Sequence, residues 1–297
     1  MPVVGLFGPT ASGKSDVAAA IADLIPAEVI SADAMQVYEG LPILTNRSAH
    51  PERLVGIWSL THEASVGEYA PLAHAAVDAI LAAGRTPVVA GGTGLYFRAA
   101  LAELELPPAP VAGQRERWEQ LYDASGADAA HDRLRELDPA AAERLHPNDR
   151  RRVVRALELA DAGESLVPDE DKLFRGAWRH PTLVVGLHVS KEVLDARIAI
   201  RTQRMFDLGV EEEARRALAG GLSSTAQKAI GLEEVTTLPR AEASEALTAR
   251  TQRYAAYQRK WMRSLEGVVM VAADRPPEET AAEIVDLARA REHLSRP

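Results

Sequence analysis

The most constraining feature of the sequence is a glycine-rich segment that matches the pattern G-x-x-x-x-G-K-[ST], Gly8-Pro9-Thr10-Ala11-Ser12-Gly13-Lys14-Ser15. With this spacing the backbone wraps around a phosphate, and the N-terminus of the following helix reinforces the field of the inward N–H groups. Lys14 supplies positive charge, and the Ser15 hydroxyl is the expected ligand of Mg²⁺. An apolar run at residues 3–7 precedes the segment and a helical pattern at residues 16–24 follows it, which predicts strand, loop and helix.

Further short apolar runs alternate with helical patterns along the chain. Strands are predicted at residues 29–31, 87–90, 182–189 and 268–271, and helices at residues 71–83, 191–208, 210–219 and 242–265. This alternation indicates an α/β fold, a P-loop NTPase-like parallel sheet flanked by helices. In such sheets the ligand site lies at the carboxyl ends of the strands, which is where the phosphate loop falls.

The composition and the predicted secondary structure of the sequence change between about residues 104 and 180. A link containing Pro107, Pro108 and Pro110 leads into charged, alanine-rich stretches with helical spacing, including a helix predicted at residues 150–162 with Asp149 as its N-cap. We therefore expect a smaller all-helical insertion domain at residues 113–178, between a first part of the core at 1–112 and a second part at 179–297.

Composition narrows the class of protein. The 297 residues are 46% hydrophobic, contain no apolar run near the roughly 20 residues of a membrane span, and begin without a secretory pattern. The absence of cysteine excludes disulfides and thiol chemistry, so a cytoplasmic location is the default expectation. A monomer is the default expectation for the oligomeric state. A net charge of −9 argues against non-specific coating of nucleic acid, although residues 144–155 and 250–263 are locally rich in arginine.

An acidic residue usually follows a hydrophobic strand in NTP-hydrolysing P-loop proteins, where it holds the magnesium ion. Here the best such strand runs into Gly91-Gly92-Thr93-Gly94 and no aspartate follows it. Asp33 lies just beyond the strand at residues 29–31, across the mouth of the sheet from the loop. Its carboxylate could act as a magnesium ligand, as a general base or as a turn cap.

Three motifs in this order and spacing resemble the tRNA dimethylallyltransferases, also called isopentenyl-tRNA transferases: residues 8–15, 30–38 and 91–96. The resemblance continues through residues 146–158, 197–209 and 251–263, the last with Tyr254, Gln258 and Trp261. It covers most of the chain. It implies transfer of the dimethylallyl group of dimethylallyl diphosphate to N6 of the adenosine on the 3′ side of a tRNA anticodon, with release of diphosphate and no use of ATP.

The resemblance also implies roles for particular residues. Asp33 matches the family's general base, and Thr93 and Arg201 are expected to contact the diphosphate or the reacting nucleotide. The phosphate loop would hold the diphosphate with Mg²⁺ as cofactor. Contacts with the tRNA anticodon stem-loop are implied for Asp33, Ala34, Met35, Gln36, Thr93, Arg115, Arg151, Arg152, Val153, Val154 and Arg155.

The chain departs from the family pattern at several positions. Ala34 stands where a serine is usual, and Gly56-Ile57-Trp58-Ser59-Leu60 replaces a histidine-rich stretch before an aspartate. Ala256-Tyr257 replaces a Lys-Arg pair, and Arg151-Arg152 a Gln-Arg pair. Two other classes of protein stay open on the residues alone: a small-molecule or nucleotide kinase that holds ATP on the loop, and a non-enzymatic, nucleotide-gated RNA-binding module.

Overall fold

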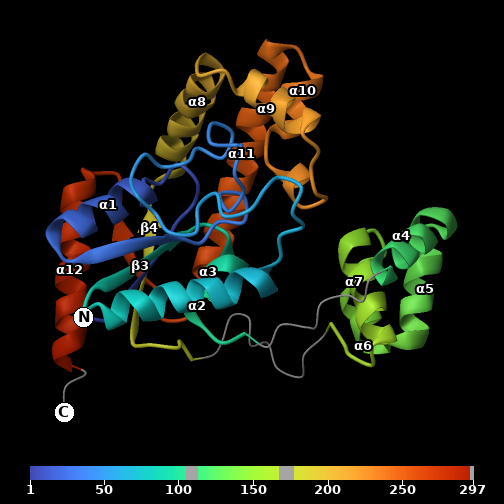
Figure 1. Ribbon diagram of the computed structural model, residues 1–297, viewed down its shortest axis with the longest axis horizontal. Helices are drawn as coiled ribbons and strands as arrows, with labels where there is room; N and C mark the ends of the chain where they lie inside the picture. Colours follow the sequence, from blue (N-terminus) through green and yellow to red (C-terminus); the bar gives the residue numbers. More distant parts are fainter. Residues whose placement is uncertain (105–112, 167–176, 295–297) are drawn as a thin grey trace. The chain divides into compact units, whose positions relative to one another are not determined.

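A computed structural model describes residues 1–104, 113–166 and 177–294 of the chain, and the side chains up to residue 291. It divides into two compact units (Figure 1). The core unit comprises Met1–Glu103 and Leu173–Pro297, and the helical unit comprises Leu104–Lys172. The proline-rich link predicted at residues 107–110 lies outside the described residues. The limits 1–112, 113–178 and 179–297 stay predictions.

A parallel five-stranded sheet in the order β2-β3-β1-β4-β5 organises the core unit. Its strands are β1 (Val3–Phe7), β2 (Ala27–Ser31), β3 (Thr86–Gly91), β4 (Thr182–His188) and β5 (Val269–Ala272). The central strand β1 pairs with β3 on one side and β4 on the other, with Gly5 opposite Val89 and Val184. All five predicted strands are present, and the α/β fold class is confirmed.

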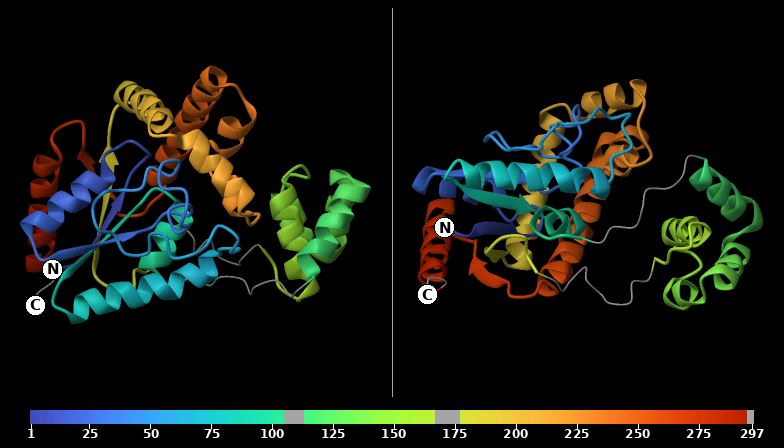
Figure 2. Two further views of the ribbon diagram at one scale, coloured as in Figure 1. Left: turned by 45° about the horizontal axis from the view of Figure 1, so that its top comes forward. Right: turned by 60° about the horizontal axis from the view of Figure 1, so that its bottom comes forward.

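Helices cover both faces of the sheet, and each face has its own apolar core (Figure 2). One core joins the sheet to α1 (Lys14–Leu24) and α12 (Pro277–Leu294), through side chains such as Ile21 and Ile284. The other joins it to α2 (Val66–Ala82) and α3 (Gly94–Leu101), through Tyr69 and Phe97. Because both faces are buried, the strands are nearly continuous apolar runs.

A third apolar cluster extends the core unit beyond the sheet. It contains residues of α8 (Lys191–Asp207), α9 (Val210–Ala219), α10 (Leu232–Thr237) and α11 (Arg240–Arg263), together with Leu41 and Leu44 from the long segment that follows β2. The short helix η1 (Ala226–Lys228) connects α9 to α10. The buried Glu213 carboxylate accepts hydrogen bonds from the backbone N–H groups of Ile43 (2.9 Å) and Leu44 (2.7 Å), which ties this segment to α9.

Helix boundaries follow local capping. The prediction placed the start of α2 at residue 71, but a capping box between Ser65 and Glu68 begins the helix at Val66, and Pro71 lies in its first turns. Asp149 caps α7 (Arg150–Asp161) as predicted, because its side chain accepts a hydrogen bond from the N–H of Arg152. No helix among the described residues is both long and apolar enough to cross a membrane.

The helical unit contains α4 (Gln114–Ser125), α5 (Ala127–Leu137), α6 (Pro139–Arg144) and α7 around a core that includes Trp118, Leu134 and Leu157. One buried carboxylate joins its helices. Glu158, whose side chain has 0% exposure, accepts hydrogen bonds from Arg115 on α4 (2.8 Å) and Arg155 on α7 (2.9 Å).

We expect Glu158→Ala to destabilise the helical unit by about 1.5–3 kcal/mol, because the hydrogen bonds from Arg115 and Arg155 to the buried carboxylate are lost while both arginines stay partly exposed. Hydrogen exchange measured by mass spectrometry would show faster exchange throughout α4–α7 and unchanged exchange in the β-sheet. Glu143→Ala, at an exposed position of α6, is the control. Unchanged exchange in α4 after Glu158→Ala would show that the ion pairs do not hold the two helices together.

Candidate active site at the carboxyl edge of the sheet

The phosphate loop leaves the carboxyl end of β1 and enters α1. Ala11 and Gly13 adopt left-handed backbone angles, with φ of 64° and 87°. This conformation turns successive N–H groups toward one point, as the sequence pattern predicts. The Ser12 hydroxyl is buried and has no hydrogen-bond partner among the described residues, which is the arrangement a donor to a bound phosphate oxygen requires.

Two partly buried cations lie at this loop. The Lys14 ammonium donates a hydrogen bond to the Pro9 carbonyl (2.8 Å), and burial lowers the pKa of Lys14 to about 8. Burial also lowers the pKa of Arg201, on α8, to about 10, and its Nε has no hydrogen-bond partner in the described part of the chain. The charge of Arg201 further lowers the pKa of Lys14, so the two cations repel each other. A bound anion would relieve both penalties.

Asp33 faces the same space. Its Oδ1 accepts hydrogen bonds from the backbone N–H groups of Met35 (2.8 Å) and Gln36 (3.2 Å), so the residue does cap a turn. Its negative charge nonetheless raises the pKa of Lys14, which shows that the carboxylate lies within electrostatic reach of the phosphate loop.

Thr10, Asp33 and Arg201 are among the residues that line a cavity of about 110 Å³. The rest of the lining is mixed: it has the apolar side chains of Met35, Leu44, Met205, Ala229, Ile230 and Leu247 and the polar ones of Thr45, Asn46, Thr202, Thr251 and Tyr254. The cavity therefore combines a site for negative charge with room for a small hydrocarbon group, beside one carboxylate.

Thr93, at the N-terminus of α3, approaches Asp33 from the neighbouring strand. Its Oγ1 accepts a hydrogen bond from the Ala34 N–H (3.4 Å) and lies 3.4 Å from the hydroxyl of Tyr254 on α11. Burial, followed by the charge of Asp33, raises the pKa of Tyr254 to about 12, so its phenol stays protonated. Thr93 and Tyr254 thus place two hydroxyl groups next to the carboxylate.

Helix α11 locks the phosphate loop against the glycine loop that follows β3. The Gln258 side chain accepts a hydrogen bond from the Thr10 N–H (2.7 Å) and donates one to the Gly92 carbonyl (2.9 Å). Trp261 stacks on Phe7 with ring centroids 5.7 Å apart and fills the space over Gly94. The sequence marked Gln258 and Trp261 only through resemblance, and this bridging function was missed.

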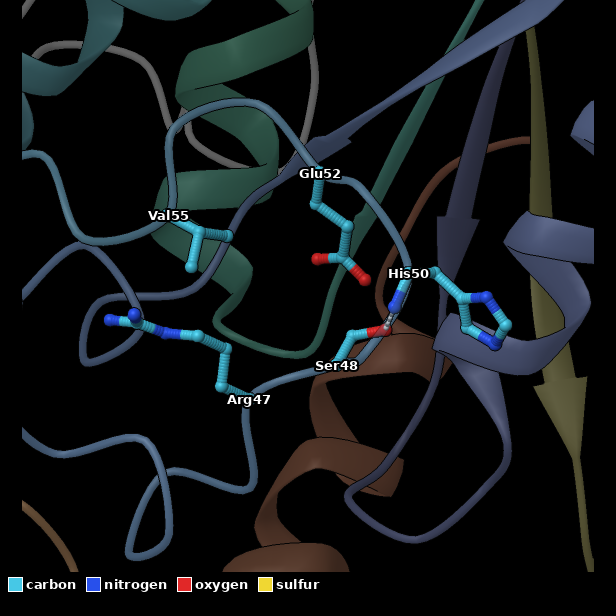
Figure 3. Close-up of a pocket in the computed structure, with 5 residues that line it drawn as sticks. All are labelled: Arg47, Ser48, His50, Glu52 and Val55. Atoms are coloured by element: carbon cyan, nitrogen blue, oxygen red, sulfur yellow. Dashed lines mark hydrogen bonds between the residues drawn. The ribbon is translucent and has the colours of Figure 1, made fainter.

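Sequence reasoning also missed Glu52. This residue lines a second cavity, of about 180 Å³, with Arg47, Ser48, His50 and Val55 (Figure 3). Burial raises the pKa of Glu52, while hydrogen bonding to the Ser15 and Ser48 hydroxyls and the charge of Lys14 act to lower it. The carboxylate therefore lies beside the last residue of the phosphate loop. A glutamate in an irregular loop carries no pattern by which the sequence could reveal it.

The remaining residues of the predicted site fall in two groups. In the core unit, Gln36 accepts a hydrogen bond from the Ser31 hydroxyl (2.9 Å) and donates one to the Thr45 carbonyl (3.3 Å), so it fixes the loop around Asp33. In the helical unit, Arg151 and Arg152 are exposed.

The other residues predicted for RNA contact in the helical unit are differently placed. Arg115 and Arg155 pair with Glu158, whereas Val153 and Val154 are buried in the core, with 0% and 3% exposure. RNA contact by the residues of this group stays a prediction, and for the two valines the buried side chains leave only the backbone for it. They hold α7 in the unit because they lie on its apolar face, opposite the exposed arginines.

Comparison with known proteins shows which family the chain is similar to. A model of the IPP transferase family matches residues 36–265, and one described as isopentenyl transferase matches residues 1–58. A tRNA dimethylallyltransferase of Salinispora tropica is 40% identical over 279 residues, which cover 88% of this chain and 85% of that protein. Its counterpart in Kineococcus radiotolerans is also 40% identical, over 283 residues, with 89% and 88% covered. The crystal structure of a tRNA isopentenylpyrophosphate transferase from Bacillus halodurans is similar, with a TM-score of 0.70, 30% identity and 97% and 96% of the two chains covered.

We expect Gly94→Ala to disrupt the contact between α3 and α11, because the new methyl group would overlap the Trp261 ring. Overpacking of this kind costs about 1–3 kcal/mol, and thermal unfolding would report it as a lower Tm. The control is Gly67→Ala on α2, where the methyl group meets only the Ser65 hydroxyl at 3.8 Å. Equal Tm values for the two variants would contradict the close approach of Trp261.

Proposed function

The chain belongs to the IPP transferase family, and from that premise we propose that it transfers the dimethylallyl group of dimethylallyl diphosphate to N6 of the adenosine on the 3′ side of the anticodon in tRNA. One observation carries the proposal most directly. Arg201 and the Asp33 carboxylate line one cavity that also has apolar side chains in its lining, and Lys14 lies within electrostatic reach of both. A diphosphate attached to a short hydrocarbon matches this combination of positive charge and apolar lining.

The chemistry follows from these positions. The N6 amine attacks the first carbon of the dimethylallyl group, the bond from that carbon to the diphosphate oxygen breaks, and the electron pair leaves with the diphosphate. The phosphate-loop N–H groups, Lys14 and Arg201 stabilise the negative charge on the leaving group. Asp33 accepts the proton that N6 loses as its bond to carbon forms, and this assistance matters because an aromatic amine is a weak nucleophile.

Thr93 and Tyr254 orient this step. Their hydroxyl groups lie 3.4 Å apart at the edge of the Asp33 loop, where they can donate to the incoming nucleotide or to the carboxylate. Since the pKa of Tyr254 is raised, its phenol is a donor at every physiological pH. Both groups position substrate and take no proton.

Mg²⁺ fits the oxygen groups at the start of α1. The Ser15 hydroxyl and the Glu52 carboxylate lie together there, and Mg²⁺ prefers oxygen ligands with several waters retained. When bound, the ion would add positive charge to the leaving diphosphate.

The base must leave the anticodon loop to reach the cavity, so a surface outside the cavity must hold the RNA. The exposed Arg151 and Arg152 at the start of α7 suit phosphate contacts. Such contacts weaken steeply with salt, whereas binding of dimethylallyl diphosphate within the cavity is less affected.

We expect Asp33→Asn to lower the rate of prenyl transfer by about 10²–10⁴-fold, the usual contribution of a general base. Asparagine retains an oxygen for the Met35 and Gln36 N–H groups, so folding and tRNA affinity should be preserved. The measurement uses labelled dimethylallyl diphosphate, Mg²⁺ and unmodified tRNA, with Asp23→Asn, exposed on α1, as the control.

Lys14→Ala should abolish incorporation in the same assay. ATP-dependent labelling of a small molecule would instead identify a kinase. Full activity of Asp33→Asn would remove the proposed base.

Binding of dimethylallyl diphosphate without tRNA should weaken as the pH rises through about 8. The pKa of Lys14 in the free protein is about 8, and only the protonated ammonium attracts the diphosphate. Because the terminal phosphate is already ionised well below this pH, the dissociation constant should be flat from pH 6.5 to 7.5 and then rise about tenfold per unit.

Isothermal titration calorimetry would measure this constant at each pH. Lys14→Arg is the control, because a guanidinium does not titrate in this range. Parallel curves for the two proteins would assign the pH dependence to another group.

A further inference from the structure

The Glu52 carboxylate takes no part in the bond changes or the proton transfer described above, yet it lies beside the phosphate loop. In Figure 3 it points into the cavity between Val55 and Ser48. Its Oε1 is buried and has no hydrogen-bond partner among the described residues. Burying a carboxylate oxygen without a hydrogen-bond partner costs free energy, so we expect a ligand to interact with this oxygen.

Contacts of the surrounding loop fix the position of Glu52. The His50 imidazole lies 3.7 Å from the carboxylate of Asp16, the residue next to Ser15. The Ser48 hydroxyl accepts a hydrogen bond from the His50 N–H (3.0 Å), which closes the loop. The segment carrying Glu52 is therefore held against the first turn of α1, where the phosphate loop ends.

The charges around the phosphate loop indicate which kind of ligand would pair with the Glu52 carboxylate. A diphosphate on the loop would face the negative charges of both Glu52 and Asp33, and each charge repels it strongly in a partly buried site. A divalent cation between Glu52 and the diphosphate turns that repulsion into attraction on both sides. The described residues contain no cluster of three histidine, aspartate or glutamate side chains, so the ion must rely on hydroxyl, phosphate and water oxygens as well.

We propose that Glu52 and Ser15 are together the protein ligands of the divalent cation that accompanies the diphosphate. The inference rests on the proposed function only in that a diphosphate occupies the phosphate loop. It assigns to an irregular loop the acidic ligand that other P-loop proteins place at the end of a strand.

The test measures binding of Mn²⁺ by electron paramagnetic resonance, with inorganic pyrophosphate present and without tRNA. We expect Glu52→Gln to weaken Mn²⁺ binding at least tenfold and Ser15→Ala to weaken it as well. Glu278→Gln, exposed on α12, should bind Mn²⁺ as the unmodified protein does. Equal Mn²⁺ affinity for Glu52→Gln and the unmodified protein would overturn the proposal.

Replacing the carboxylate with a thiol gives a second test, in which the expected result is a gain of Cd²⁺ binding and not a loss of Mn²⁺ binding. The chain contains no cysteine, so Glu52→Cys carries its single thiol. Thiolates select soft metals, and we expect this variant to prefer Cd²⁺ to Mn²⁺ and to show a thiolate-to-cadmium absorption band when pyrophosphate is added. Glu278→Cys is the matched control. Pyrophosphate-dependent bands of equal strength in both variants, or in neither, would contradict a ligand role for position 52.

These outcomes separate the inference from the proposed function. If pyrophosphate and Mn²⁺ bind together and Glu52→Gln removes only the Mn²⁺, the metal ligand is established even if the protein transfers no prenyl group to tRNA. If prenyl transfer proceeds and Glu52→Gln leaves the Mn²⁺ affinity unchanged, the proposed function is supported and the proposed role of Glu52 as a metal ligand is contradicted.

Discussion

Repulsion between two partly buried cations shapes this candidate active site. Lys14 and Arg201 come from the first and the eighth helix, and burial lowers the pKa of both, to about 8 and about 10. Holding them together without a bound anion costs free energy, so the site is prepared for a ligand that carries several negative charges. The Asp33 carboxylate compensates part of this positive charge, since it raises the pKa of Lys14. The opposed charges of the two cations and the carboxylate are what the proposed roles of phosphate binding and proton transfer rest on.

The scaffold that holds these charges is assembled from distant parts of the sequence. Gln258 hydrogen-bonds both to the phosphate loop and to the glycine loop after β3, and Trp261 covers Phe7 and Gly94. Helix α11 thus holds together the phosphate loop and the glycine loop after β3. A displacement of α11 would move both loops at once, because the Gln258 side chain is hydrogen-bonded to a backbone atom of each loop.

The sequence predicted what local pattern and motif can encode. The strands were found because a buried parallel strand is a continuous apolar run, and the phosphate loop because its glycines fix the backbone. The start of α2 was placed too late because the Ser65–Glu68 capping box outweighs Pro71. Glu52 and the bridging role of Gln258 could not be predicted, because each depends on a contact between segments that sequence spacing does not report. Val153 and Val154 were grouped with arginines by resemblance, whereas helical periodicity turns them into the core.

The missing acid at the end of β3 has a steric explanation. A side chain at Gly91 would overlap the backbone carbonyl of Ala32, and one at Gly92 would overlap Gln258. The segment after β2 lies close to the end of β3 because the Ala32 N–H donates a hydrogen bond to the Ala90 carbonyl (2.8 Å). This contact brings the Asp33 loop over the end of the strand. The close approach that places Asp33 beside the phosphate loop therefore excludes a carboxylate from β3. Any acidic ligand for a cation must come from another segment, and the loop that carries Glu52 is held against the first turn of α1 where such a ligand is needed.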